Sequence, residues 1–143
     1  MAQRISGLTV RGRPIRVAHR GGHRFAVQIR GHELTVDQPR GSGGDDAGPT
    51  PTELFAASLA SCVAFYAGRY LHRHGLERTG LRVRTEFTMA TDRPARIDTV
   101  HVTVLPPPGL PEQRRAALLA VASHCTVHNT LRQPPEVVIG LEP

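Results

Sequence analysis

The segment PTELFAASLASCVAFYAGRYL, residues 51–71, determines how the rest of the chain can fold. Thr50 is a suitable N-cap, and Pro51 suits the first helical position. With Glu53 in the first turn, these signals predict a helix that begins at Pro51, continues through Leu54 to Tyr70 and is ended by Gly75. The helix is apolar nearly all round and rich in alanine and serine, which let another backbone approach closely. We therefore expect a long central helix that is buried on most sides, in part by a second subunit.

Short strands are predicted on both sides of this helix. Before it, apolar and polar residues alternate in four runs separated by turns, near residues 8–10, 15–17, 25–29 and 34–36. The glycine-rich stretch 38–52 then predicts a long loop of the kind usually kept for function. After the helix, the pattern predicts strands at 81–89 and 100–104, helices at 110–123 and 125–131, and a last strand at 137–139. This order lacks a regular βαβ alternation and predicts an α+β fold in a single domain, residues 1–143.

The composition argues against nucleic acid as a partner. The formal net charge is +6, and all 18 basic residues are arginine. They are scattered without a basic block, and six aromatic residues offer little surface for base stacking. We therefore expect no nucleic-acid partner and assign the charge mainly to solubility.

The same sequence predicts a cytoplasmic protein with no membrane partner. It contains no uninterrupted run of about 20 apolar residues, which a bilayer span needs. The first residues lack the apolar core of a secretory signal. Two cysteines do not make a disulfide framework, so we expect any disulfide to be transient and chemical.

The two cysteines, Cys62 and Cys125, are the candidate chemical groups. Cys62 lies about three turns into the predicted helix, so it needs a nearby cation, most simply an arginine, to become reactive. Cys125 begins the short predicted helix, where free backbone N–H groups favour a thiolate, and His124 and His128 flank it. Two other interpretations stay open. Cys62 could be a small packing residue, or the two cysteines and two histidines could form a mixed zinc set.

Two motifs carry a resemblance to a known family. GPTPTELFAASLASC, residues 48–62, is followed some 60 residues later by SHCTVHNTL, residues 123–131. Together with the order of elements, these motifs resemble the OsmC/Ohr superfamily over nearly the whole chain. The resemblance implies an OsmC-like fold with antiparallel sheets around a long central helix, in an intertwined homodimer with two sites at the subunit interface.

The resemblance also implies a thiol peroxidase site. Cys62 would attack the peroxide and become a sulfenic acid, and Cys125 would condense with it to a disulfide. The family glutamate falls at Thr52, so its neighbour Glu53 is the candidate here. The arginine that activates the thiolate would come from the N-terminal strands or the glycine-rich loop, where Arg20 and Arg40 are the candidates, with Arg24 as a further choice.

The function predicted on this basis is reduction of organic hydroperoxides in oxidative stress defence, with no cofactor and no metal. A pocket lined by Phe55, Leu59 and Phe65 would favour organic peroxides over hydrogen peroxide. An external thiol, either dihydrolipoyl, thioredoxin or a small thiol, would reduce the disulfide. The alternative is a non-catalytic dimer that binds a small hydrophobic or thiol-reactive ligand in the same pocket.

Overall fold

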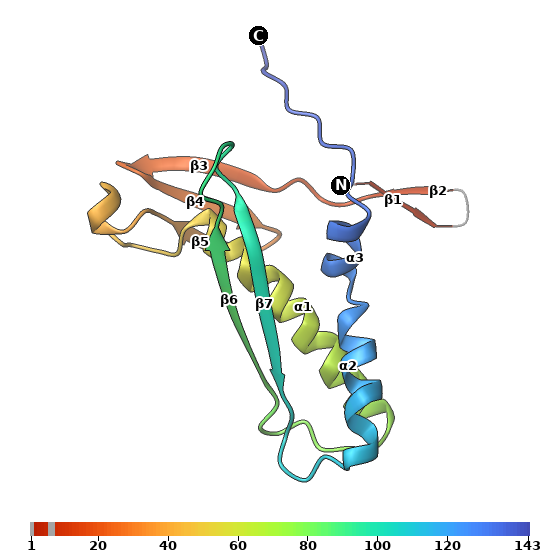
Figure 1. Cartoon of the computed structure of the whole chain (residues 1–143). Helices are drawn as coiled ribbons and strands as arrows, with labels where there is room; N and C mark the ends of the chain where they lie inside the picture. Colours follow the sequence, from red (N-terminus) through yellow and green to blue (C-terminus); the bar gives the residue numbers. More distant parts are fainter. Residues whose placement is uncertain (1, 6–7) are drawn as a thin grey trace. The chain divides into compact units, whose positions relative to one another are not determined.

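The computed structural model describes residues 2–5 and 8–143 of the chain. It divides into two compact units, residues 1–54 and residues 55–143. Each unit is built from local antiparallel pairings, as expected for an α+β protein (Figure 1).

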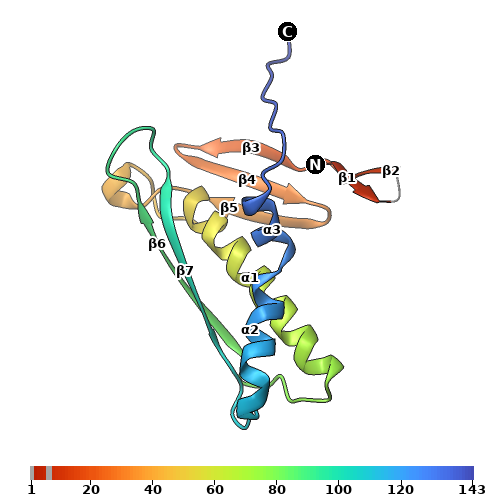
Figure 2. The ribbon, with the colours of Figure 1, turned by 45° about the vertical axis from the view of Figure 1, so that its right-hand side comes forward.

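The first unit consists of strands. They are β1 (Ala2–Ile5), β2 (Leu8–Arg11), β3 (Arg16–Gly21), β4 (Arg24–Ile29) and β5 (His32–Val36). β1 pairs with β2, and β3, β4 and β5 form a three-stranded antiparallel meander (Figure 2). The four predicted strand regions are confirmed, whereas the sequence pattern did not indicate β1. Gly22 enables the tight β3–β4 turn, because its φ of 55° lies in the left-handed region.

A buried aspartate organises the loop after β5. Asp37 is almost fully buried, and its carboxylate accepts hydrogen bonds from the backbone N–H groups of Gln38, Asp45 and Ala47 at 2.7, 3.1 and 3.0 Å. The loop packs closely, since a Cβ atom at Gly44 would lie 2.0 Å from a backbone oxygen. The predicted loop is therefore an ordered structure, which includes the 3₁₀ turn η1 (Arg40–Ser42).

The central helix α1 (Pro51–Arg73) begins with a capping box. The Glu53 N–H donates to Thr50 Oγ1 at 3.2 Å, and the Thr50 N–H donates to Glu53 Oε1 at 2.8 Å. The three predicted start signals, Thr50, Pro51 and Glu53, are confirmed. At the other end, Gly75 adopts a φ of 65°, as a glycine after a helix C-terminus commonly does.

Burial of α1 within the chain is confined to one face, so the prediction of a helix buried on most sides is not met by this chain alone. The buried residues follow helical spacing: Ala56, Leu59, Val63, Ala67, Tyr70 and Leu71. Phe55 and Phe65 are exposed, the latter by 61%. By length and composition α1 could also cross a bilayer, whereas no segment apolar enough to do so was expected from the sequence. One face of α1 packs in the core formed by the buried cluster.

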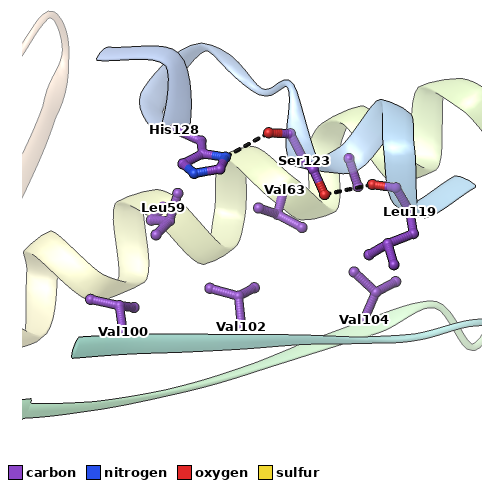
Figure 3. Close-up of a pocket in the computed structure, with 9 residues that line it drawn as sticks. Leu59, Val63, Val100, Val102, Val104, Leu119, Ser123 and His128 are labelled. Carbon is purple, nitrogen blue, oxygen red and sulfur yellow. Dashed lines mark hydrogen bonds between the residues drawn. The ribbon is translucent and has the colours of Figure 1, made fainter. Parts of the chain in front are cut away.

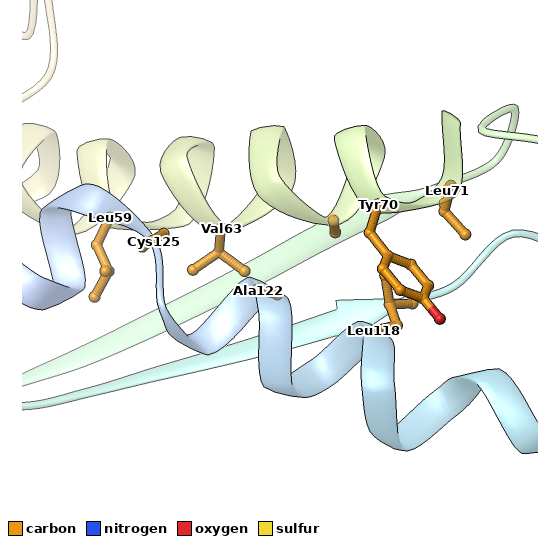
Figure 4. Packing of buried hydrophobic residues seen from close by; sticks show 8 residues of the cluster. Leu59, Val63, Tyr70, Leu71, Leu118, Ala122 and Cys125 are labelled. Carbon is orange, nitrogen blue, oxygen red and sulfur yellow. The ribbon is translucent and has the colours of Figure 1, made fainter. Parts of the chain in front are cut away.

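The second unit encloses that core. Its further elements are β6 (Arg82–Met89), β7 (Ile97–Leu105), the 3₁₀ turn η2 (Glu112–Arg114), α2 (Arg115–Ser123) and α3 (Thr126–Arg132). β6 and β7 form an antiparallel hairpin whose inner side chains pack, with α1 and α2, around the buried cluster (Figure 4). The cluster consists of Leu59, Val63, Ala67, Tyr70, Leu71, Leu118, Ala122 and Cys125.

The predicted last strand at 137–139 is wrong for this chain. Residues 134–143 carry no strand assignment, and Ile139 is 92% exposed. A β-branched run favours extended backbone, but a strand also needs a neighbour for its N–H and C=O groups. Composition alone does not provide that neighbour.

Candidate thiol site

The fold brings the two cysteines together. Cys62 lies in the middle of α1, and Cys125 is the N-cap residue of α3, 63 positions later in the chain. Both are free thiols; Cys62 packs against the buried cluster that contains Cys125 and lies close enough to raise the pKa of that thiol. Cys62 is partly exposed, whereas Cys125 is 0% exposed in the core. The site therefore contains one thiol that a solute can reach and one that it cannot.

The buried thiol is held in its protonated form at neutral pH. Burial is the main cause that raises the pKa of Cys125 above its ordinary value of 9.0, and the neighbouring Cys62 raises it further. The His128 backbone N–H, which donates to Cys125 Sγ at 3.4 Å, acts in the opposite direction but is outweighed. A protonated Cys125 can donate its S–H hydrogen to a thiolate on Cys62.

The side chains of the flanking histidines bond backbone carbonyl groups, and it is the backbone N–H of His128 that donates to Cys125 Sγ. His124 Nδ1 bonds the Ala120 carbonyl at 2.7 Å, and His128 Nδ1 bonds the Ser123 carbonyl at 2.6 Å. Both Nδ1 atoms are therefore engaged by backbone carbonyl groups rather than by the thiols. Within residues 2–5 and 8–143, no three His, Cys, Asp or Glu side chains gather as metal ligands, so the zinc set is not assembled either.

A tyrosine beside the thiols was missed by sequence reasoning. Tyr66 lies one turn after Cys62 on α1, and its hydroxyl is hydrogen-bonded to Thr126 Oγ1 at 2.7 Å. Thr126 directly follows Cys125, so this bond joins the start of α3 to the helix that carries Cys62. Arg69 lies over the Tyr66 ring, with its guanidinium carbon 4.7 Å from the ring centroid. The spacing from Cys62 to Tyr66 is the usual i, i+4 neighbour spacing, a signal that the sequence does contain.

The other predicted site residues belong to the first unit, whereas both cysteines lie in the second. Arg20 is on β3 and pairs loosely with Glu33 at 4.0 Å, and Arg40 opens the η1 turn. Glu53 is occupied by the capping box, where hydrogen bonds from the Thr50 N–H and hydroxyl hold its pKa below the ordinary 4.5. The pairing of an arginine with Cys62 therefore stays a prediction.

Among these arginines, Arg24 has the firmest orientation. Its Nη1 donates to Asp45 Oδ2 at 2.7 Å, and Asp45 belongs to the loop that Asp37 holds. A guanidinium fixed by a carboxylate is the arrangement that an activating arginine requires. Arg24 was only a further choice in the sequence, because no pattern linked it to an aspartate 21 positions away.

An apolar cavity also lies in the second unit, between α1, β7, α2 and α3 (Figure 3). Of the three residues predicted to line a pocket, Leu59 lines this one, whereas Phe55 and Phe65 are exposed and do not. The cavity has a volume of about 220 Å³.

Fold and site together define a class of α+β protein in which a partly exposed thiol on the central helix lies near a buried thiol at the start of a later helix. The chain belongs to the OsmC family, described as OsmC-like proteins, since the profile of that family matches residues 43–140. No curated protein matches the chain.

Solved structures of the family share the fold. A protein of Psychrobacter arcticus, described as osmotic stress-induced and involved in a detoxification response, is 25% identical, with a TM-score of 0.76 over 86% of this chain and 91% of its own. The organic hydroperoxide resistance protein OsmC of Legionella pneumophila is 21% identical, with a TM-score of 0.64 over 84% and 90%. OhrB of Bacillus subtilis, also an organic hydroperoxide resistance protein, is 19% identical, with a TM-score of 0.61 over 85% and 92%. Family membership and these names suggest a peroxide-related stress function.

Proposed function

We propose that this protein is a cysteine-dependent peroxidase that reduces organic hydroperoxides. The observation that carries the proposal is the contact between Cys62 and Cys125, two free thiols of unequal exposure in one core. A chain that used its cysteines only as packing residues would have no need to place them against one another.

The partly exposed thiol is suited to the first step. The Cys62 thiolate attacks the distal oxygen of a hydroperoxide ROOH, forms an S–O bond and breaks the O–O bond, which gives Cys62 sulfenic acid and the alkoxide RO⁻. The alkoxide takes a proton and leaves as the alcohol ROH. Phe65 lies three residues further along α1, exposed to solvent, and offers apolar surface to the group R.

The buried thiol is suited to the second step. Cys125 sulfur attacks the sulfenic sulfur, an S–S bond forms, and the hydroxyl leaves with the thiol proton as water. Because Cys125 is fully buried, peroxide in solution reaches Cys62 first. An external dithiol then reduces the disulfide and becomes a disulfide itself, so each cycle converts ROOH and a dithiol to ROH, water and the oxidised reductant.

The active form is proposed to be a homodimer. The face of α1 that carries Phe55 and Phe65 is exposed in the single chain, although both side chains are large and apolar. A second copy would cover such a face. We propose that either Arg24, Arg20 or Arg40 completes the site next to Cys62.

The test is peroxide consumption by the reduced protein, with tert-butyl hydroperoxide and hydrogen peroxide compared. Wild type is expected to reduce the organic peroxide faster and to form a Cys62–Cys125 disulfide detectable by mass. Cys62→Ser is expected to abolish both. Reaction with both peroxides at the slow rate of a free thiol, without a disulfide, would reject the peroxidase and favour the non-catalytic ligand-binding alternative.

A further inference from the structure

The walls of the cavity beside α1 are apolar side chains that alternate along strand β7 and lie one turn apart on α1. Val100, Val102 and Val104 alternate along β7 and so point from the same face of the hairpin toward α1 (Figure 3). Leu59 and Val63 on α1 form the facing wall. The remaining lining residues are Leu119, Ala122, Ser123 and His128. Neither cysteine is among the lining residues, although the cavity borders the thiol site, since His128 also donates its backbone N–H to Cys125 Sγ at 3.4 Å.

His128 is the polar residue at one end of this cavity, and its hydrogen bond determines which ring nitrogen carries the hydrogen. Its Nδ1 is 2.6 Å from the Ser123 carbonyl oxygen, and because a carbonyl can only accept, Nδ1 must carry the hydrogen. The neutral ring therefore has its lone pair on Nε2, which is turned toward the cavity (Figure 3). Ser123 does not compete for a ligand, since its hydroxyl donates to the Leu119 carbonyl at 2.7 Å.

We propose that this cavity binds a small aliphatic carboxylic acid, with its carboxyl group on His128 Nε2 and its alkyl chain among the valines. An acid and this ring nitrogen can share one proton in either of two ways, as a neutral O–H···N bond or as a carboxylate paired with an imidazolium. In both forms the donors and acceptors match. An alcohol forms only the weaker neutral bond, and an alkylammonium leaves an unpaired charge among apolar walls.

The volume limits the length of the acid. At about 30 Å³ for each water-sized group in a liquid, 220 Å³ holds on the order of seven non-hydrogen atoms. The cavity is smaller than the roughly 300–1,000 Å³ pockets that take drug-sized ligands. Hexanoic acid, with six carbons and two oxygens, has eight non-hydrogen atoms, which is close to this number, and it serves as the probe.

The experiment is a calorimetric titration of the full-length protein with hexanoate, and with hexan-1-ol and hexylamine as matched ligands. Hexanoate is expected to bind at least tenfold more tightly than either, in line with hydrogen bonds that involve a charged group. His128→Phe is expected to weaken hexanoate binding at least tenfold. His124→Phe is the matched control and should leave it unchanged, because His124 does not line this cavity.

Two further measurements keep the test independent of any folding defect in the His128 variant. In wild type, nitrogen NMR should show the His128 Nε2 resonance shifting on addition of hexanoate while the His124 resonances stay in place. Val102→Phe should fill the cavity and abolish hexanoate binding, with the peroxide reaction of Cys62 retained. Equal binding of acid and alcohol, equal affinity in His128→Phe, or an unmoved His128 resonance would each overturn the proposal.

Discussion

The rates at which iodoacetamide alkylates the two cysteines test directly whether burial makes Cys125 less reactive than Cys62. Only the thiolate reacts with iodoacetamide. At pH 7.5 a thiol with the ordinary pKa of 9.0 is about 3% thiolate, and the raised pKa of Cys125 reduces that fraction further. Cys125 is also 0% exposed, so the reagent must wait for local opening. An opening that costs about 3 kcal/mol slows labelling about 100-fold, before the smaller thiolate fraction is counted.

The variant Cys62→Ala tests whether burial alone keeps Cys125 slow to label. Burial is the largest cause of the raised pKa of Cys125, and the neighbouring thiol is a lesser one. The variant should therefore keep Cys125 at least about 30-fold slower to label than a free thiol, since a milder opening cost near 2 kcal/mol already gives this factor. In wild type, Cys62 should label first.

The assay is differential alkylation with isotopically distinct reagents, followed by mass spectrometry of the peptides that contain each cysteine. Urea-unfolded protein is the control, in which both cysteines should label at similar rates. Labelling of Cys125 as fast as Cys62 in the folded wild type would refute the prediction that burial makes Cys125 the less reactive thiol. Fast labelling of Cys125 in the Cys62→Ala variant alone would show that the partner thiol, and not burial, protects it.

Four other outcomes are expected. Cys125→Ser should still consume one equivalent of organic peroxide but accumulate a sulfenic acid, trapped by dimedone, and lose turnover with a dithiol. Tyr66→Phe removes the hydrogen bond to Thr126, which is worth about 1 kcal/mol. Disulfide formation should slow about fivefold, while the first step with peroxide is unchanged. Stopped-flow fluorescence or quenched-flow mass analysis would measure the two rates. Leu71→Ala should lower the free energy of unfolding in urea by about 2–5 kcal/mol, because this side chain is 0% exposed. The Ala47 N–H, with two other backbone donors and a nearby arginine, lowers the pKa of Asp37 below 3.8. The stability that the Asp37 carboxylate contributes is therefore complete above pH 3.8 and is lost as the pH falls through the lower pKa of the folded protein. In Asp37→Asn, the urea midpoint should change less across that acidic range than in wild type.

The sequence predicted the helix and most strands because those elements follow local rules. The capping box of Thr50 and Glu53 is contained in four residues, and alternation in 25–29 and 81–89 is visible without any partner. The failure at 137–139 shows the limit of these rules. A run of β-branched residues favours extended backbone, but whether a neighbouring strand is present depends on the rest of the fold and not on the local sequence.

The candidate thiol site rests on the same kind of local signal. The two cysteine motifs are local, and the structure places Cys62 and Cys125 near one another. The interactions of Asp37, Tyr66 and Arg24 were not predictable, since each joins residues that are separated by 8 to 60 positions. Side chains of these types are common on surfaces, and only the fold distinguishes a bonded one from a solvated one.

The unequal burial of the two thiols gives the proposed cycle its order. A peroxidase with two equally exposed thiols could be oxidised at either, and over-oxidised at both, before a disulfide formed. In the proposed cycle peroxide reacts at the partly exposed Cys62, while burial keeps Cys125 from solvent and raises its pKa. The reaction of Cys125 then depends on the nearby sulfenic sulfur, which it already contacts, rather than on its own nucleophilicity in solution. Burial that would make an isolated cysteine inert is thus compatible with a resolving role, provided that its target lies within contact distance.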